Sequence, residues 1–357
     1  MKTQMSPGHF RAGAVPPRKE EETVNRRAKL LAVAAGLGLT ASVLGATAAQ
    51  ADPTGTPAFR QLAGVGSDTT TPVMNALSNT ITVNGTKVIG SYDATGSATI
   101  QTQSSAACTI NRPNGSGAGR AALLASLEAN NGAGDGCLQF SRSSSVNTAA
   151  TGGPKLTYIP FAVDAVTYAI TDNSIVPRSL TLAQLQAIYQ CNPAFVGTGP
   201  NFSIVPLLPQ PGSGTRSFWE TEMGITDTQV TSGALPCISD TSGGSLIEEQ
   251  DGRVLTSNTL IPFSIASYDA EESQTISDVR GNAVLGVVNG ITSQQINTSF
   301  QVTREVYNVI PTNDQTVAPW STVFVGSGSL VCSNTATIQQ YGFNPDPNCG
   351  STATTTQ

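Results

Sequence analysis

Stretches of β-strand character alternate along this chain with stretches of helical character. Apolar residues at helical spacing predict helices over 119–130 and 180–191, the second with Thr181 as its N-cap. The β-prone stretches cover residues 87–93, 137–144, 156–171, 202–209, 258–269, 283–290 and 304–310. This alternation restricts the chain to an α/β fold and predicts a mainly parallel central sheet.

Four of the expected turns combine glycine with hydroxyl residues. They read GVGSDTTTPV from residue 64, RPNGSGAGR from 112, FSRSSS from 140 and GSGTR from 212. A strand, a glycine-rich turn and a helix start bring free backbone N–H groups to the positive end of the helix dipole. Such turns predict an oxyanion site. The alternative is a plain connection in which glycine forms the turn and Ser or Thr caps the helix.

These four turns are expected to meet in space. In open α/β sheets, the turns at the carboxyl ends of the strands form the ligand site. The sequence has no GxxxxGK[ST] motif, and the glycines at 115, 117 and 119 do not have GxGxxG spacing. No cofactor is therefore expected.

Charge and histidine content exclude several functions. Residues 52–357 carry 11 Lys and Arg against 21 Asp and Glu, a net charge of about −10, and Lys87 and Lys155 are their only lysines. Nucleic-acid binding needs a basic surface, so we do not expect it. The single histidine is His9, ahead of the segment that we expect to be removed. The mature chain therefore lacks Ser-His-Asp or Cys-His catalysis and His-ligated metals.

The N-terminal 51 residues have the pattern of a secretory signal peptide. Arg26, Arg27 and Lys29 precede an apolar run over 30–46, and Ala49-Gln50-Ala51 forms a small-x-small cleavage site before Asp52. A membrane anchor is the alternative, but the run is short, rich in Ala and Gly, and lacks a charged stop. We expect cleavage after Ala51 and secretion.

Six cysteines follow the predicted cleavage site, and none has CxxC spacing. In an exported chain this favours three disulfides over a metal site. Nearest-neighbour pairing is our expectation, because each bridge then closes one local excursion of the chain. The expected pairs are Cys108–Cys137, Cys191–Cys237 and Cys332–Cys349.

Seven segments, in order, resemble the phosphate-binding receptors of bacterial phosphate ABC transporters. They are GVGSDTTTPV, GSGAGRAAL, FSRSSS, YIPFAVDAV, LTLAQLQAIY, GSGTRSFW and PFSIASYD, spread over 64–269, and RGNAVLGVVNG with REVYNVIP resembles the actinobacterial branch. The resemblance implies a type II periplasmic-binding-protein fold, with two α/β lobes joined by two hinge strands. It places lobe 1 at 52–162 plus 263–357 and lobe 2 at 163–262, with crossovers at 159–166 and 261–268.

The same resemblance implies a ligand-binding site between the lobes. Its residues would be Asp68, Thr69, Ser116, Gly117, Ser143, Ser144, Ser213, Gly214 and Thr215. Three positions depart from the family. An arginine and an acid often precede GSGT, where this chain has Pro209 and Pro211, and the aspartate that accepts the phosphate proton is replaced by Ser144.

Other residues must then supply the charge and the proton acceptor. Arg112, Arg142 and Arg216 are the candidates for the charge, each with a surface or helix-end salt bridge as its alternative role. Our expected site includes Arg142 and Arg216, and Asp68 is the candidate acceptor.

The resemblance also implies the partners. Inorganic phosphate or a similar oxyanion is the expected ligand, and a phosphate ABC transporter permease is a candidate partner of an otherwise monomeric protein. The residue directly after the expected cleavage site is Asp52 and not cysteine, so we do not expect the lipid anchor that is usual in Gram-positive receptors.

Two other functions stay open at this point. The fold could be reused for adhesion, cell-wall contact or another small ligand. A secreted serine hydrolase with a Lys or Asp base is the second, although neither Lys87 nor Lys155 lies near a serine in a recognised motif. We expect a binding protein and not an enzyme.

Overall fold

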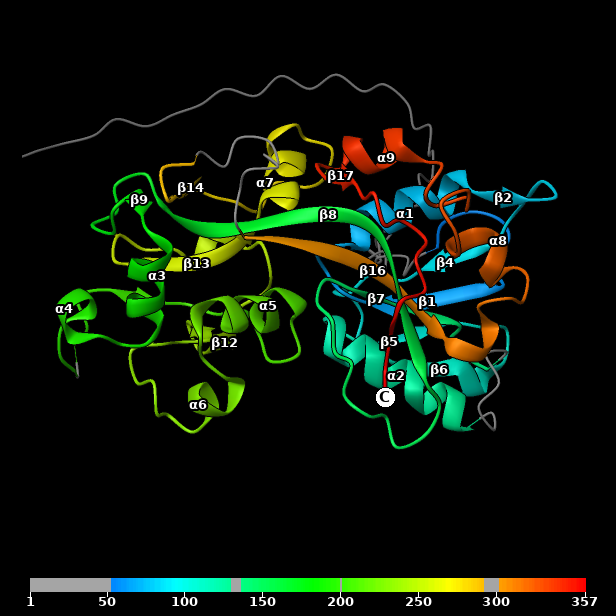
Figure 1. Cartoon of the computed structure of the whole chain (residues 1–357), viewed down its shortest axis with the longest axis horizontal. Coiled ribbons are helices and arrows are strands. Elements are labelled where there is room, and N and C mark those ends of the chain that lie inside the picture. The colour runs from blue at the N-terminus through cyan, green and yellow to red at the C-terminus, as the bar shows by residue number, and fades with distance from the viewer. Residues whose placement is uncertain (1–52, 130–135, 200, 292–301) are drawn as a thin grey trace, which may run out of the picture. The chain divides into compact units, whose positions relative to one another are not determined.

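A computed structural model describes residues 53–129, 136–199, 201–291 and 302–357 (Figure 1). They belong to one compact unit, Ala46–Gln357. The predicted signal peptide with its cleavage site, and His9, lie outside the described residues.

The main sheet has ten strands among the described residues, and its central path runs β10-β13-β8-β16-β7-β1-β4. These strands are β10 (Val205–Pro206), β13 (Thr259–Ser264), β8 (Leu156–Thr171), β16 (Thr303–Pro311), β7 (Phe140–Ser143), β1 (Leu62–Gly66) and β4 (Ile89–Ser91). Off this path, β14 (Ala283–Leu285), β17 (Asn344–Pro345) and β18 (Thr354–Thr355) pair with β8.

The expectation of a mainly parallel sheet was wrong. β1 runs parallel to β4 and β7, and β10 runs parallel to β13, but every partner of β8 is antiparallel to it. Strand-helix alternation holds at both ends of the sheet. The long β8 and β16 lie antiparallel between them, and a local pattern cannot reveal that pairing.

Helices and short strands complete the fold. The helices are α1 (Thr71–Thr80), α2 (Ser116–Ala129), α3 (Leu182–Tyr189), α4 (Pro193–Val196), α5 (Gly214–Met223), α6 (Asp227–Thr231), α7 (Ile265–Glu272), α8 (Trp320–Phe324) and α9 (Thr335–Gln340), with 3-10 turns at Ala106–Cys108, Gly252–Val254 and Thr312–Asp314. The short strands are β2 (Thr82–Val83), β3 (Thr86–Lys87), β5 (Thr99–Gln101), β6 (Thr109–Asn111), β9 (Ser179–Leu180), β11 (Thr241–Ser242), β12 (Ser245–Leu246) and β15 (Val287–Val288).

Most of the predicted elements are confirmed. The strand predicted over 156–171 is β8, and α3 begins after Thr181, whose hydroxyl and Gln184 form a capping box. The strand predicted over 202–209 is reduced to two residues, Val205 and Pro206. Two further prolines, at 209 and 211, lack the N–H that a longer strand pairing would use.

Apolar residues are buried in two places. The α1–α2 core comprises two neighbouring clusters around Leu62, Leu77 and Leu123, and the α3–α5 core surrounds Leu185 and Trp219. β8 contributes to both, with Leu156 to Ala162 in the first and Ala165 to Ile170 in the second. In Figure 1, β8 in green and β16 in orange run side by side between the helices of the two cores.

The apolar cores do not follow the expected lobe boundary at residue 263. Leu285, Val288 and Val302 pack in the α3–α5 core, because β14 pairs with the end of β8. The strand that accompanies β8 from Leu156 to Ala165 is β16, whereas β13 pairs only with Val166 to Ala169. Within the segment 261–268, expected as the return crossover, Ile261, Phe263 and Ile265 pack in the α3–α5 core and Ala266 packs in the α1–α2 core.

All three predicted disulfides are confirmed: Cys108–Cys137, Cys191–Cys237 and Cys332–Cys349. Each closes a loop of moderate length, which stabilises the folded chain by roughly 2–4 kcal/mol per bridge in the chain-entropy model. Within the described residues, no helix has the length and apolar character needed to cross a membrane.

Candidate functional site

The four hydroxyl-rich turns meet at one place, as the sequence predicted. Ser144, after β7, lies with its hydroxyl 3.1 Å from that of Ser67 and 3.4 Å from that of Ser116. The hydroxyls of Thr69 and Thr215 lie 3.2 Å apart. The turns after β1 and β7, the start of α2 and the start of α5 thus form one polar cluster.

Close packing of the turns explains two of their glycines. A Cβ at Gly214 would come within 2.2 Å of the Ser116 hydroxyl and 2.3 Å of the Ser144 hydroxyl. Gly115 has φ +98°, and a Cβ there would meet the carbonyl oxygen of Gly212 at 2.5 Å. A larger residue at either position would push the two turns apart.

A buried carboxylate lies at the centre of this cluster. Glu249, on the segment after β12, is 3% exposed and accepts hydrogen bonds from both Thr69 and Thr215. The backbone N–H and the hydroxyl of Thr69 lie 3.3 and 2.5 Å from Oε2 of Glu249. Those of Thr215 lie 3.5 Å from Oε1 and 3.2 Å from Oε2. We call these four donors the anion grip.

The anion grip is formed by the starts of two helices. Thr215 lies in the first turn of α5, whose N-cap Ser213 accepts the backbone N–H of Arg216 at 2.9 Å. Thr69 precedes α1, where Thr70 is the N-cap without a side-chain cap bond and a proline occupies the first turn. Both helix dipoles therefore place positive potential at the carboxylate.

Arg304 brings a positive charge to the grip from β16. Its Nη2 donates to the hydroxyls of Thr215 and Thr69, at 3.0 and 3.4 Å. The same atom pairs with Asp164 Oδ2 at 2.8 Å, and both side chains are buried. Asp164 also accepts the Ser264 hydroxyl at 2.9 Å, at the start of α7. The ion pair with Asp164 therefore holds the Arg304 guanidinium beside Thr69 and Thr215.

Asp68 lies in the same turn as Thr69. Burial is the main cause that raises the pKa of its carboxyl to about 8, with the charges of Glu249 and then Glu248 adding to it, while Arg142 lowers the pKa. At neutral pH the Asp68 carboxyl is therefore mostly protonated, so it can donate a hydrogen bond to an anion.

Arg142 and Arg216, both predicted as ligand residues, already have several partners. Arg142 is fully buried and donates to Ser67, Gly64, Ser91, Thr71 and Tyr92, so it supports the β1–α1 turn from behind. Arg216 bonds to Glu220, Asp227, Asp240 and the carbonyl of Pro209. Arg112, the third candidate cation, bonds to Ser97 and the Asp93 carbonyl.

The remaining predicted residues surround the grip. The Ser116 hydroxyl accepts the backbone N–H of Ser144 at 3.0 Å, and the Gly117 N–H donates to the Gly212 carbonyl at 3.0 Å. The hydroxyl of Ser143 is bonded to the Ser145 carbonyl, at 2.6 Å.

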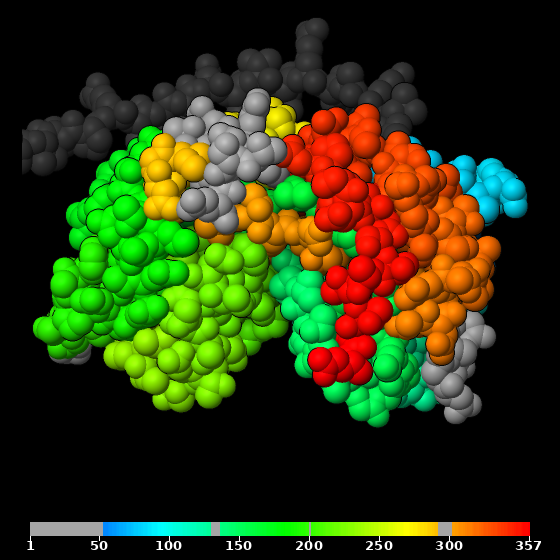
Figure 2. Space-filling view, viewed as in Figure 1, coloured from blue at the N-terminus to red at the C-terminus, as the bar shows by residue number. Residues whose placement is uncertain are grey.

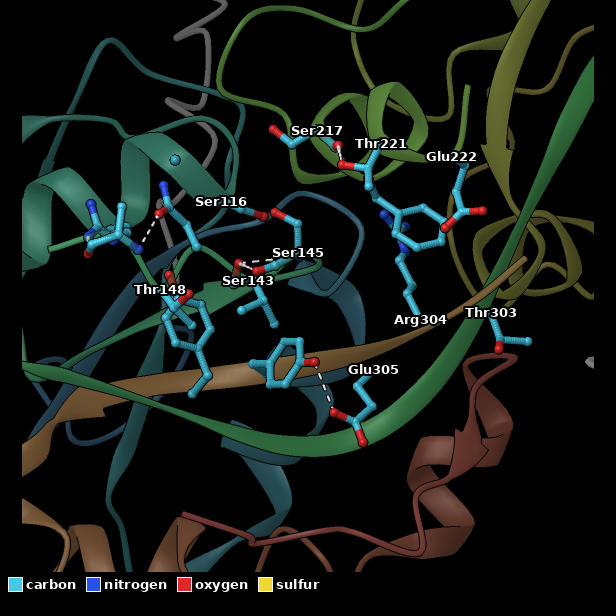
Figure 3. A pocket seen from close by; sticks show the side chains of 18 residues that line it. Ser116, Ser143, Ser145, Thr148, Ser217, Thr221, Glu222, Thr303, Arg304 and Glu305 are labelled. Carbon is cyan, nitrogen blue, oxygen red and sulfur yellow. Dashed lines mark hydrogen bonds between the residues drawn. The ribbon is translucent and has the colours of Figure 1, made fainter. Parts of the chain in front are cut away.

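A cavity of about 720 Å³ lies next to the cluster. Figure 3 shows Ser217, Thr221 and Glu222 of α5 on one side of it, Ser116, Ser143 and Ser145 on the other, and Arg304 extending from β16 toward α5. Tyr158 and Tyr307 line it as well. Figure 2 shows a hollow between the light-green and teal parts of the chain, the colours of α5 and α2.

A model of the PBP superfamily domain matches residues 48–337. The chain belongs to the PBP superfamily. This match and the α/β architecture confirm the predicted periplasmic-binding-protein fold class. No curated protein matches the sequence.

The chain is also similar to solved structures, at low sequence identity. A protein from Clostridium perfringens, described as a phosphate ABC transporter substrate-binding protein with bound phosphate, aligns with a TM-score of 0.50 and 19% identity, covering 80% of this chain and 99% of its own. An ABC-type phosphate transport receptor from Vibrio cholerae aligns with a TM-score of 0.47 and 16% identity, covering 80% of this chain and 100% of its own.

The sequence analysis did not single out three residues of this candidate site: Asp164, Glu249 and Arg304. Asp164 is the only charge in the β-prone run 156–171, and Arg304 begins the run 304–310. Opposite charges inside two β-prone runs indicate a buried pair, so this signal was present in the sequence. Glu249 gave no such signal, because it lies in an acidic stretch, Glu248 to Asp251, that reads as a surface loop.

Proposed function

We propose that this protein is a secreted solute-binding protein for an inorganic oxyanion, with phosphate as the preferred ligand. One observation carries the proposal: four donors from two helix starts hold the carboxylate of Glu249. A carboxylate is itself an oxyanion, so this set of donors has the chemistry that a phosphate oxygen requires.

The ligand's charge would be balanced by Arg304, in the role of the family's arginine ahead of GSGT. The Arg304 guanidinium already donates to both threonine hydroxyls, whereas Pro209 and Pro211 occupy the family positions. The proposed ligand-binding residues are Asp68, Thr69, Ser116, Gly117, Ser143, Ser144, Gly214, Thr215 and Arg304, and Ser213 supports them as the N-cap of α5. Arg142 and Arg216 act through these residues, as supports of the two turns.

Ligand entry requires a movement, because Thr69 and Thr215 are 1% and 2% exposed. We propose two lobes built on the α1–α2 core and the α3–α5 core, with β8 and β16 as the hinge strands. Contacts between the two sides support this arrangement, since Asn114 bonds to both Gln210 and Glu248. Separation of these contacts would open the grip. A phosphate transporter permease is the proposed partner of this monomeric receptor.

A phosphate ester is a second candidate ligand. The adjacent cavity of about 720 Å³ is much larger than an inorganic ion needs, and Tyr158 and Tyr307 in its wall could cover an organic group. Its phosphoryl group would take the same grip.

Calorimetric titration of purified, ligand-stripped protein tests the function. Above pH 8, phosphate and arsenate should bind more tightly than sulfate and molybdate at one site per chain, because the ionised Asp68 carboxylate can then accept the proton that phosphate and arsenate carry. A phosphate monoester that binds more tightly than phosphate would select the second candidate. Absence of binding heat with every one of these anions would contradict the proposal.

A further inference from the structure

Glu249 is held firmly at the grip by its neighbours in the chain. The backbone N–H of Gln210 donates to the Ile247 carbonyl at 2.8 Å, and Asn114 Nδ2 donates to Glu248 Oε2 at 2.8 Å. Gln250, directly after Glu249, has a left-handed backbone with φ +59°. The carboxylate therefore occupies the grip through a short anchored segment and not through a long flexible loop.

The buried charge of Glu249 depends on the grip itself. Within the described residues, no Lys or Arg lies at ion-pair distance from Glu249, and Arg304 pairs with Asp164 instead. An ionised carboxylate in a buried site requires hydrogen-bond donors. Here the four donors of Thr69 and Thr215 meet that requirement, so they cannot hold a second anion at the same time.

We propose that Glu249 is a tethered competitor that sets the affinity of the grip: a free oxyanion binds only by displacing the Glu249 carboxylate from Thr69 and Thr215. This inference rests on the proposed oxyanion-binding function. It assigns Glu249 as a specificity-determining residue, because only an anion that bonds better than a carboxylate to these four donors displaces it.

Tethering makes such competition effective. A carboxylate on a short segment acts at an effective concentration of ~1 mM or more, and no free carboxylate has to be supplied. The apparent affinity for a free ligand equals the intrinsic affinity multiplied by the fraction of molecules in which the grip is empty. Occupancy by Glu249 in nine molecules of ten would weaken phosphate binding about tenfold.

The test compares Glu249→Ala with Glu248→Ala in the full mature chain. Both variants remove one negative charge from the same segment, and both charges act on Asp68, but only Glu249 touches the grip. Calorimetry with phosphate should show Glu249→Ala binding about tenfold or more tighter than wild type. Glu248→Ala should stay within about threefold of wild type, since it changes only the local potential.

A second readout needs no knowledge of the natural ligand. Glu249→Ala leaves four donors unpaired, so its melting temperature should fall, and added acetate should restore it more than it stabilises wild type or Glu248→Ala. A Glu249→Ala protein that acetate does not stabilise, or that binds phosphate no better than wild type, overturns the tethered competitor. If wild type and Glu249→Ala bind phosphate equally well, the oxyanion-binding function still stands. If neither wild type nor Glu249→Ala binds an oxyanion, the proposed function and this inference are both overturned.

Discussion

The two turns of the anion grip are held in place in different ways. The turn before α5 is self-contained, because Ser213 caps the helix that its own turn begins and Arg216 bonds back to the Pro209 carbonyl. The turn between β1 and α1 has no side-chain cap at Thr70 and is supported from outside by Arg142 of β7. Similar hydroxyl-rich motifs can thus form the same site with internal or with distant support.

Arg142→Ala should give the largest loss of stability among these variants. Of the two turns, it should disrupt only the one between β1 and α1. It removes five hydrogen bonds from a fully buried guanidinium, so we expect the free energy of unfolding to fall by about 3–5 kcal/mol. Denaturant unfolding measures this loss. Arg112→Ala, which removes a more exposed guanidinium, is the control and should cost about 1 kcal/mol. Equal losses in the two variants would contradict the supporting role of Arg142.

Replacing the Arg304–Asp164 pair should lower the affinity for phosphate, because Arg304 contacts the threonines of both turns. The double variant Arg304→Gln with Asp164→Asn removes both charges, so no uncompensated buried charge remains. Phosphate affinity should drop about 100-fold, because the ligand loses its counter-charge. Calorimetry measures the drop, and Asp164→Asn alone, which keeps the arginine, is the reference. Unchanged affinity in the double variant would exclude Arg304 from the site.

Ser213 and Thr215 look alike in the sequence, but the structure gives them different roles. Thr215→Val should lower phosphate affinity about tenfold or more, because it removes a hydroxyl of the grip, while Thr221→Val on the same helix should not. Ser213→Ala should chiefly cost about 1 kcal/mol of stability, as the loss of an N-cap does. Paired calorimetry and denaturant unfolding would measure both effects, and a larger affinity loss in Ser213→Ala than in Thr215→Val would contradict this division.

Asp68→Asn should give the smallest change in stability, and the size of that change depends on pH. Its folded pKa of about 8 lies above the ordinary 3.8, so the folded chain keeps a proton between about pH 4 and 8 that the unfolded chain loses. Stability therefore falls as pH rises through this window, and Asp68→Asn should flatten that slope in denaturant unfolding.

The same proton affects anion selection. Below pH 8 a protonated Asp68 can donate to sulfate and phosphate alike, so Asp68→Asn should leave their affinity ratio nearly unchanged at pH 7. At pH 9 the ionised carboxylate repels sulfate, whereas hydrogen phosphate can donate to it, and the wild-type preference for phosphate should grow several-fold. A ratio that does not depend on pH would argue against contact between Asp68 and the ligand.

The sequence predicted what local patterns determine. The α/β class, the extent of β8, the cap of α3 and the three disulfides all follow from periodicity, capping residues and cysteine spacing. The convergence of the four turns also followed, because turns at strand ends meet in this kind of sheet. The strand β16 was predicted over 304–310, but its pairing with β8 was not, since that pairing joins residues far apart in the chain.

Site residues that act over a distance were harder to predict. Arg142 has the charge that an anion ligand requires, and its neighbours in the sequence are serines. In the structure, however, its buried guanidinium donates to the backbone of β1 and of the turn that follows it. Glu249 reaches the grip only because the segment after β12 packs against Asn114 and Gln210. Contacts of this kind leave no periodic pattern in the sequence.

The most direct test is a crystal structure of the mature protein with arsenate, whose anomalous scattering locates the anion independently of the refined chain. We predict arsenate within hydrogen-bond distance of the backbone N–H groups of Thr69 and Thr215 and of Arg304, with the Glu249 carboxylate withdrawn. Arsenate bound elsewhere, with Glu249 still accepting from both threonines, would contradict the account.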